Sequence, residues 1–377
     1  MWENPIGDCE IVFMKVLIIN TVNTRRNGIT NVIFNLYHSI DKNNISFDLV
    51  TKNVPDHTYT NTIEISGGKI ITIPKSKFHV IRYIRTLKGI IRRNRYEMVH
   101  IHGNSHTVVL ELLAAKLAGC KVRIVHAHST TCNSPMLHKL LSPLFHLLCT
   151  HRLACGQAAG QFMHGNHAFT VINNGVNTEK FSFHSKDRLE IREQYQIHDK
   201  IVIGHVGNFV DAKNPFFLID ILANLKKTNL DYCMLLVGDG PLLSQVKEKT
   251  KNLGLTDSVI FVGATDNVPA YISACDVIMM PSLFEGLPLT LIEQQTNGLK
   301  CLVSDQITTE VDKTGNIIFL PIDKGVEPWV SAMRELDLSY NREAMSRLAV
   351  EKIKQSGYDI RTEAKNLRMY YDNCVKE

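Results

Sequence analysis

The sequence predicts an α/β protein built from two doubly wound parallel sheets, each in a domain of its own. The chain has 377 residues, 44% of them hydrophobic, which is enough to bury a large core and is long for a single domain. Short apolar runs alternate with segments of helical spacing, the pattern of a parallel sheet covered on both faces. This alternation starts twice, at residue 15 and again at residue 200.

The first predicted domain covers residues 14–182. Its opening strand is an apolar run, KVLIIN, that polar residues and Gly28 follow. The apolar residues after Gly28 recur at helical spacing, which gives the order strand, loop, helix. The predicted elements are strands at 15–20, 47–50, 98–101 and 123–126, and helices at 29–40, 79–94 and 108–118.

The second predicted domain covers residues 183–359. The turn-rich segment VINNGVN, residues 171–177, leads into polar residues and places the boundary near Phe181. A final helix, at about residues 360–377, could pack back on the first domain or serve the second. The predicted elements between them are strands at 201–207, 233–237, 259–262 and 277–280, and helices at 215–227 and 242–253.

Basic residues are concentrated in the first domain. Cut after Ser182, the chain has 20 Lys and Arg against 10 Asp and Glu in the first part and 22 against 27 in the second, although the whole chain carries only +5. The first part also holds 13 of the 16 histidines. This distribution favours an anionic partner for the first domain, such as phospholipid headgroups or a lipid diphosphate. We expect no nucleic-acid binding, because no recognised module and no basic run interleaved with aromatic residues is present.

The sequence favours a cytoplasmic protein. Its nine cysteines form no Cys-x-x-Cys pair and no regular spacing, so neither a disulfide framework nor a zinc site is indicated. The first thirteen residues contain acids and no basic residue, unlike a secretory signal. No apolar run is long enough to span a bilayer. We therefore expect any membrane contact to be peripheral, on the inner face of the cell membrane.

The segment VIMMPSLFEGLPLTLIEQQTNG, residues 277–298, is the most informative candidate for a binding site. A buried strand leads into a loop with Glu285 and Gly286 and then into a helix with Pro288 in its first turn. A helix N-terminus beside a strand end offers unpaired amides and a positive dipole to a diphosphate. Glu293, farther along the helix, could accept hydrogen bonds from a ribose, and Glu285 could reach sugar hydroxyls. The alternative is that both glutamates are solvated surface acids.

Several further motifs accompany this segment along the chain. They are RLACGQAAGQFMHG (152–165), VINNGVNTEKF (171–181), GHVGNFVDAKN (204–214), LLVGDGPL (235–242), VIFVGATDNVPAYISACDVIMMPS (259–282) and CLVSDQITTEVDKTG (301–315). Together with the two glutamates eight residues apart in PSLFEGLPLTLIEQQ, they resemble glycosyltransferase family 4 from about residue 14 to the C-terminus. The last motif is similar to the exopolysaccharide and capsule branch. The resemblance implies the GT-B architecture, two Rossmann-like domains that face each other across a substrate cleft.

The resemblance implies a retaining glycosyltransferase that needs no metal and no other cofactor. Its donor would be a nucleotide-diphosphate sugar, with UDP-sugars as the first expectation, and it would transfer a hexose or an N-acetylhexosamine. Its acceptor would be a glycan or a polyprenyl-diphosphate-linked oligosaccharide in exopolysaccharide or capsule biosynthesis. We expect front-face attack, because the sequence offers no convincing carboxylate pair for double displacement, and no clustered Asp or His ligands argue for a metal. Two alternatives stay open, a nucleotide-sugar epimerase of the same architecture and a non-catalytic nucleotide-sugar-binding subunit.

Five residues match family positions that hold the donor. Glu285 matches the glutamate that binds hydroxyls of the donor sugar, and Glu293 matches the one that binds the ribose. The amides of Gly286 and Leu287 match those that bind phosphate. Lys213 matches a lysine that neutralises the departing diphosphate, with a solvated loop lysine as the alternative.

Asn208 departs from the family pattern, because an arginine usually stands there beside the lysine. Without a metal, cations and amides must stabilise the charge that develops on the diphosphate. The amide of Asn208 can still donate a hydrogen bond, so the departure implies a slower enzyme rather than an inactive one. It also keeps the binding-subunit alternative open.

His128, in IVHAHST, matches a family histidine close to the reacting carbon of the sugar, so the resemblance implies a catalytic role. His126 precedes it by two residues and would share its side of a continuing strand, but we expect it in the core. His100 and His102 form a similar pair in VHIHG, and we expect them to pack or to line the cleft.

Three turn residues complete the predicted donor site. Gly28 would let the backbone approach the donor phosphates or the acceptor, and Gly240 and Ala264 match turns near the nucleotide; each could instead be an ordinary turn. The Gly-rich turn at 238–241 does not predict NAD binding, because its third glycine is missing. In the first domain, the basic helix at 79–94 is expected to pack on the sheet and could attract anionic lipid.

Overall fold

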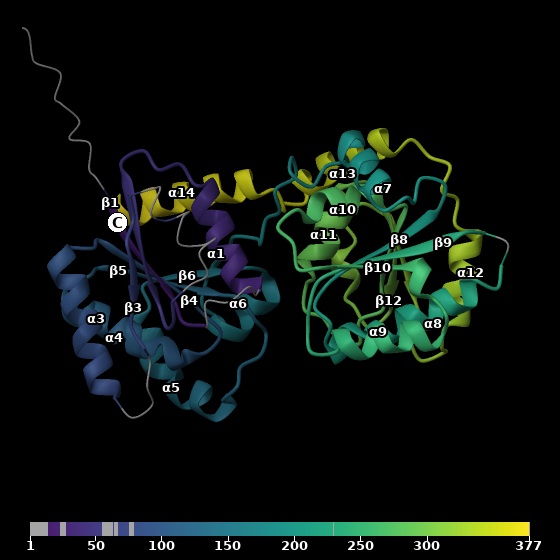
Figure 1. Cartoon of the computed structure of the whole chain (residues 1–377). Helices are drawn as coiled ribbons and strands as arrows, with labels where there is room; N and C mark the ends of the chain where they lie inside the picture. The colour runs from purple at the N-terminus through teal and green to yellow at the C-terminus, as the bar shows by residue number, and fades with distance from the viewer. Residues whose placement is uncertain are drawn as a thin grey trace, which may run out of the picture. The chain divides into compact units, whose positions relative to one another are not determined.

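The computed structural model describes residues 14–22, 28–54, 63, 67–74, 79–228 and 230–376. It divides the chain into two compact units, Met1–Gly175 with Ile360–Glu377, and Val176–Asp359. Each unit has one sheet, and all of the described strand pairs are parallel. The predicted fold class is therefore confirmed (Figure 1).

The first unit alternates strands with helices. Its elements are β1 (Met14–Asn20), α1 (Gly28–Ser39), β2 (Ile45–Thr51), β3 (Ile70–Thr72), α3 (Val80–Asn94), β4 (Met98–Gly103), α4 (Val109–Ala118), β5 (Val122–Ala127), α5 (Pro135–Leu148), β6 (His151–Ala154), α6 (Gln157–His164), β7 (Thr170–Val171) and α14 (Ile360–Lys376). The seven strands lie in the order β3-β2-β1-β4-β5-β6-β7.

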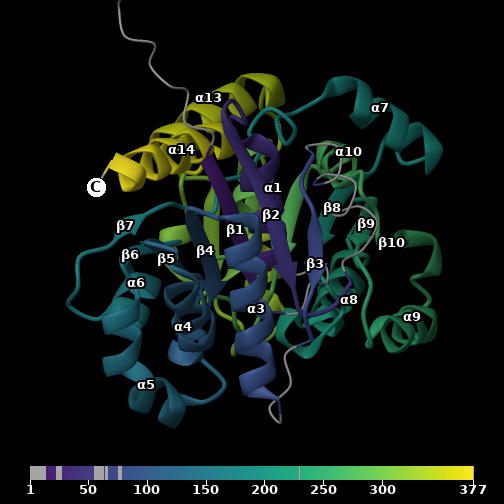
Figure 2. The same ribbon diagram turned by 90° about the vertical axis from the view of Figure 1, so that its left-hand side faces the viewer.

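The two faces of this sheet carry different side chains. Val99 and Ile101 of β4 belong to the apolar core under α3, α4, α5 and α6, and Figure 2 shows these helices together on one side of the sheet. Successive side chains of a strand point to opposite faces. His100 and His102 of the same strand therefore point to the other face, where a cavity is lined by residues of α1 and α14.

The second unit repeats the plan with six strands, in the order β10-β9-β8-β11-β12-β13. Its helices and strands are α7 (Ser185–Gln194), β8 (Ile201–Val206), α8 (Pro215–Leu225), β9 (Tyr232–Val237), α9 (Leu243–Asn252), β10 (Val259–Gly263), α10 (Val268–Ala274), β11 (Val277–Met280), α11 (Leu289–Thr296), β12 (Lys300–Ser304), β13 (Ile317–Leu320), α12 (Glu327–Glu335) and α13 (Arg342–Gln355).

Both faces of the second sheet are buried. Val202 and Ile278 pack into one apolar cluster, and their chain neighbours Ile203 and Val277 pack into another. Strands that are apolar on both faces are typical of a parallel sheet with a helical layer on each side. The continuous apolar runs of the sequence predict this burial.

The units divide seven residues earlier than we predicted, after Gly175 instead of Ser182. The backbone N–H of Val176 donates to the Tyr358 carbonyl at 2.8 Å, and the Thr178 hydroxyl donates to the Asp359 carboxylate at 2.6 Å. The segment after Gly175 is thus bonded to the second unit. Hydrogen bonds between residues so far apart leave no trace in local sequence, which is why the turn-rich composition misplaced the boundary.

The final helix, α14, belongs to the first unit. The Arg368 guanidinium donates to the backbone carbonyls of Asp41 and Asn43 at 3.1 and 2.7 Å, and the Tyr371 ring contacts Phe47 of β2. Within the described ranges, none of the helices combines the length and the apolar character needed to cross a membrane.

Candidate functional site

Lys213 and Glu285 lie in two loops at the carboxyl ends of neighbouring strands, β8 and β11. The Lys213 ammonium donates to the Glu285 carboxylate, and the two side chains are only 17% and 14% exposed. A backbone hydrogen bond from Leu283 N–H to the Ala212 carbonyl, 2.8 Å long, joins the same two loops. The structure therefore brings together two residues that are 72 positions apart in the sequence.

The local backbone explains how Lys213 reaches this position. A single 3-10 turn, Asp211–Lys213, follows β8, and Asn214 then takes a left-handed conformation with φ of 52° before Pro215 begins α8. Asparagine tolerates this conformation better than most residues, and proline suits the first position of a helix. The loop is thereby held short and turns its lysine toward Glu285.

Glu285 and Gly286 form the loop before α11, and Gly286 has an open backbone with nothing within 4 Å of an added Cβ. The helix itself begins at Leu289, and Pro288 is its N-cap residue. We had expected Pro288 in the first turn, so that prediction is wrong by one position. The Ser282 hydroxyl of the same loop is buried and has no hydrogen-bond partner. Leu287 stands between Gly286 and the cap, half-buried.

Glu293 lies in the second turn of α11 and points into low-dielectric surroundings. Burial raises the pKa of Glu293 to about 8, and Lys180 opposes this shift. A carboxylate with few solvating partners gains most from a ligand that donates hydrogen bonds to it, such as a diol. This environment suits the expected ribose contact.

Three neighbouring loops, after β8, β9 and β10, make close backbone contacts. The N–H of Phe209 donates to the Asp239 carbonyl at 3.0 Å, and the N–H of Gly238 donates to the Gly263 carbonyl at 2.9 Å. An added Cβ on Gly240 would lie 2.5 Å from the Phe209 carbonyl oxygen. Only glycine allows this approach.

Asn208 and Ala264 lie on these loops, and both are exposed. With Gly240, they occupy the carboxyl ends of β8, β9 and β10, three strands in a row. The predicted donor-binding residues of the second unit therefore gather at one edge of its sheet. Ligands of open α/β sheets bind at this edge.

His205 is a neighbour of Lys213 that sequence reasoning missed. It is buried in β8, its Nδ1 lies 3.0 Å from the Met279 carbonyl, and burial lowers its pKa to about 4, with Lys213 adding to the effect. A Cβ on Gly207 would be 3.1 Å from the His205 ring and 3.6 Å from the Lys213 side chain. The sequence signal was available in the strand-end motif GHVGN, but a lone strand histidine is usually structural.

His128 follows β5 in the first unit, and its Nε2 lies 2.8 Å from Nδ1 of His102. Burial lowers the pKa of His128 to about 3, so the ring is neutral. Gly28 is the first residue of α1, and the segment 23–27 before it lies outside the described residues. His128 and Gly28 thus belong to the first unit, whereas the other predicted donor-binding residues belong to the second.

His100, His102 and His126 are 0%, 2% and 0% exposed, which favours packing over cleft-lining for the first two and agrees with the core position expected for the third. Each can offer one ring nitrogen within 4.8 Å of the others, a separation that could hold a metal ion. We had expected no cluster of histidine ligands, and this expectation is wrong. Strand register, which sequence alone does not give, brings the three together.

Two parallel sheets with helices on both faces, each in its own unit, have the GT-B architecture. HepE of Anabaena, solved in complex with UDP, superimposes with a TM-score of 0.74 and 16% identity, over 96% of this chain and all of that one. A glycosyltransferase from Rickettsia africae gives a TM-score of 0.75 with 15% identity, over 97% and 99% of the two chains.

Sequence comparisons identify the family. The family model described as Glycosyltransferase Family 4 matches residues 26–180, and that of Glycosyl transferases group 1 matches residues 187–312. EpsF of Bacillus subtilis (strain 168), which is named as a glycosyltransferase, is 31% identical to this chain. The match covers 82% of this chain and 84% of EpsF. An α-1,3-galactosyltransferase of Escherichia coli is 31% identical over 58% of this chain and 60% of its own. The chain belongs to glycosyltransferase family 4.

Proposed function

We propose that the chain is a retaining, metal-independent glycosyltransferase of exopolysaccharide or capsule biosynthesis. Its donor is a UDP-hexose or UDP-N-acetylhexosamine, and its acceptor is a polyprenyl-diphosphate-linked glycan. The Escherichia coli relative supports this choice, because its name gives UDP-Gal as donor and an α-D-GlcNAc-diphosphoundecaprenol as acceptor. A relative from Salmonella typhi, 33% identical over 35% of this chain, is named for Vi polysaccharide biosynthesis.

The ion pair between Lys213 and Glu285 is the observation that carries the proposal. A partly buried ammonium next to a carboxylate can exchange that partner for the diphosphate of a donor. Glu285 is then free to accept hydrogen bonds from the hydroxyls of the sugar. One contact thus places a cation for the departing phosphate beside an acceptor for the sugar.

The chemistry needs stabilisation of negative charge more than it needs a base. As the bond between sugar and diphosphate breaks, charge develops on the phosphate oxygens. Lys213, the side-chain amide of Asn208 and the backbone amides of Gly286 and Leu287 donate to those oxygens. Such preorganised donors are commonly the largest catalytic contribution in an enzyme that uses no metal. The acceptor hydroxyl attacks from the same side, and a phosphate oxygen takes its proton.

The test is a nucleotide-release assay over UDP- and GDP-sugars, with and without polyprenyl-diphosphate-linked acceptors. We expect release only with a UDP-sugar and an acceptor, unchanged when Mg²⁺ or Mn²⁺ is added. Glu285→Gln should abolish it, and Glu248→Gln, an exposed acid of α9, serves as the matched control. Full turnover in Glu285→Gln would remove the role given to that residue.

The same assay separates the two alternatives. An epimerase would convert the donor sugar when no acceptor is present. A binding subunit would bind the donor and release no nucleotide with any acceptor. Asn208, at the position where the family has arginine, is the feature that favours this second candidate.

A further inference from the structure

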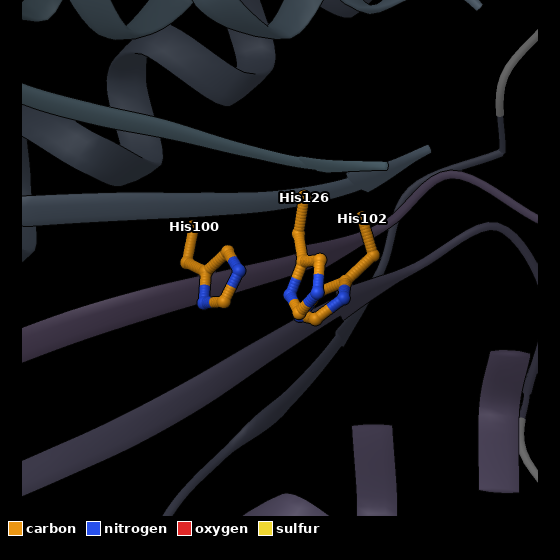
Figure 3. A group of neighbouring side chains, drawn as sticks. All are labelled: His100, His102 and His126. Carbon is orange, nitrogen blue, oxygen red and sulfur yellow. The ribbon is translucent and has the colours of Figure 1, made fainter. Parts of the chain in front are cut away.

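Four histidines form a row in the first unit, which does not contain Lys213 or Glu285. His100 and His102 belong to β4, His126 belongs to β5, and His128 follows it. His102 and His126 are direct partners in the parallel register of the two strands. Figure 3 shows the rings of His100, His102 and His126 gathered on the same side of these strands.

Two of the rings have one nitrogen engaged and held. Nδ1 of His100 lies 2.6 Å from the Tyr371 hydroxyl of α14. Nδ1 of His102 lies 2.8 Å from Nε2 of His128. In each ring this hydrogen bond fixes the orientation and assigns the other nitrogen, Nε2, to any ligand in the centre of the group.

The remaining nitrogens are short of partners. Nε2 of His100 and both ring nitrogens of His126 are buried and make no hydrogen bond of normal geometry. The Ile172 backbone is close enough to one nitrogen of His126 to influence its pKa. A neutral imidazole carries one donor and one acceptor, so three unpaired nitrogens in two neighbouring rings are unusual in a folded interior. A group that accepts lone pairs, placed between the rings, would satisfy one nitrogen of each ring, and the Ile172 backbone is available to the other nitrogen of His126.

We propose that His100, His102 and His126 bind a zinc ion. Imidazole is a preferred zinc ligand, and three histidines with a water in the fourth position form an established tetrahedral arrangement. Ring nitrogens around zinc lie roughly 3.3 Å apart, so the observed limit of 4.8 Å requires the separations between ring nitrogens to shorten by up to about 1.5 Å. Small side-chain rotations supply such a movement.

We place the fourth ligand, a water, in a cavity that His100 and His102 line and His126 does not. This cavity has a volume of about 10 Å³ and is also lined by Tyr371, which is room for about one water molecule. A zinc-bound water loses a proton near neutral pH, which reduces the net charge that the apolar surroundings must hold. Histidine ligands usually donate their second N–H to an oxygen or another acceptor. Tyr371 and His128 occupy those positions.

The ion would join β4, β5 and α14, because Tyr371 reaches His100 from the last helix of the chain. We assign it a structural role in the first unit. It is separate from the metal-independent chemistry proposed for Lys213 and Glu285, so either proposal can fail without the other.

The experiment measures metal in the purified, untagged full chain. Protein stripped with a chelator and dialysed against zinc should hold one zinc per chain by mass spectrometry of the metal. Cobalt loaded in its place should give the visible absorption of a tetrahedral Co²⁺ site. Zinc should also raise the melting temperature by several degrees, since a ligand that binds only the folded state stabilises it.

Variants locate the site. His126→Gln should lose the zinc, whereas the control His106→Gln should keep it. His106 is a buried histidine of the same unit, but its ring nitrogens contact the carbonyls of His138 and Met163. Tyr371→Phe keeps all three ligands, removes only the orienting hydroxyl and should weaken zinc binding about 10–100-fold. That variant keeps the test valid if His126→Gln does not fold.

Two results would overturn the proposal. One is wild-type protein that holds far less than one zinc per chain after loading, so that a buried water alone occupies the cavity. The other is zinc retained in full by His126→Gln and bound with unchanged affinity by Tyr371→Phe.

Discussion

Lys213 is the residue whose surroundings indicate a chemical role most clearly. Its ammonium is mostly buried and meets one carboxylate, that of Glu285. Replacing one member of a partly buried ion pair leaves the other charge without a partner. Any effect on turnover must therefore be separated from an effect on folding.

Lys213→Gln should lower turnover by roughly 100- to 1,000-fold, the usual cost of removing one charge-stabilising donor. Affinity for the sugar part of the donor should change much less. Lys247→Gln, an exposed lysine in the same unit, is the control. The melting temperature of each variant shows whether folding contributes. Turnover within a few fold of wild type would exclude Lys213 from charge stabilisation.

Asn208→Arg tests the departure from the family pattern. Asn208 is exposed, so we expect an arginine to be accommodated. Added positive charge beside the departing diphosphate should leave turnover equal or raise it. The measurement is the rate of nucleotide release at saturating donor. A large decrease would show that the amide makes a contact that arginine cannot replace.

Glu293 predicts a pH dependence of stability. Its pKa is about 8 in the folded chain and 4.5 in the reference state, so the folded chain binds more protons between these values. Stability contributed by the protonated form is therefore greatest at low pH and is lost as the pH rises toward 8. Urea midpoints of wild type should fall more between pH 6 and pH 9 than those of Glu293→Gln. Parallel pH profiles would contradict this.

The sequence identifies candidate site residues more readily than it identifies which residues contact one another. Glu285, Glu293 and Lys213 could be selected because they sit in recognisable strand-end motifs. That Lys213 contacts Glu285, or that Tyr371 contacts His100, depends on tertiary packing between distant segments. No local pattern encodes such pairs, which is also why the histidine cluster was missed.

At the scale of elements, the loops after β8 and β9 approach each other closely at Gly207 and Gly238. A Cβ on Gly238 would lie 2.0 Å from the Gly207 carbonyl oxygen, closer than any real contact allows. The backbone would have to move, and with it the loop that carries Asn208 and Lys213. The glycines are therefore required by the packing of the loops and not only by their turns.

Gly238→Ala should destabilise the second unit by about 3 kcal/mol or more, as severe overpacking does. Gly254→Ala is the control, because Gly254 has φ of 66° but open space around it. That change should cost only the 1–2 kcal/mol or so of a left-handed alanine. Urea unfolding measures both. Equal losses would mean that backbone conformation, and not the close approach, explains the glycine.

Some strongly periodic helices were predictable, whereas the shortest strands were not. The helices predicted at 79–94 and 242–253 correspond to α3 and α9 within a residue or two. The strands β3 and β7 have three and two residues and were not predicted, because segments this short have no detectable period. They form by pairing with the sheet edge rather than from local preference.

At the scale of the whole molecule, the excess of positive charge lies in the first unit. Its helix α3 buries Tyr83, Leu87, Ile90 and Ile91 and leaves a basic outer face. The sequence predicted this amphipathic arrangement from spacing alone. Helix α5 of the same unit also exposes apolar side chains, with Met136 83%, Leu140 71% and Leu147 69% exposed. Basic and apolar surface together suit an anionic membrane.

The last prediction concerns that surface. The chain should bind vesicles of phosphatidylcholine and phosphatidylglycerol, bind phosphatidylcholine alone weakly, and lose most of the binding at high salt, because exposed charges are screened. Each basic residue near an anionic surface contributes about 1 kcal/mol. Replacing the four exposed arginines of α3 by glutamine removes about 4 kcal/mol and should therefore weaken binding on the order of 1,000-fold. These residues are Arg82, Arg85, Arg92 and Arg93.

The control removes the same number of charges from the second unit, at exposed lysines remote in sequence from α3. These are Lys186, Lys247, Lys251 and Lys324. If the membrane recognises the first unit, this variant binds as wild type does, whereas loss of net charge alone would weaken both variants equally. Vesicle sedimentation at several salt concentrations distinguishes the two. Equal weakening, or binding that salt leaves unchanged, would reject a basic docking face and leave the apolar side chains of α5 to explain any contact.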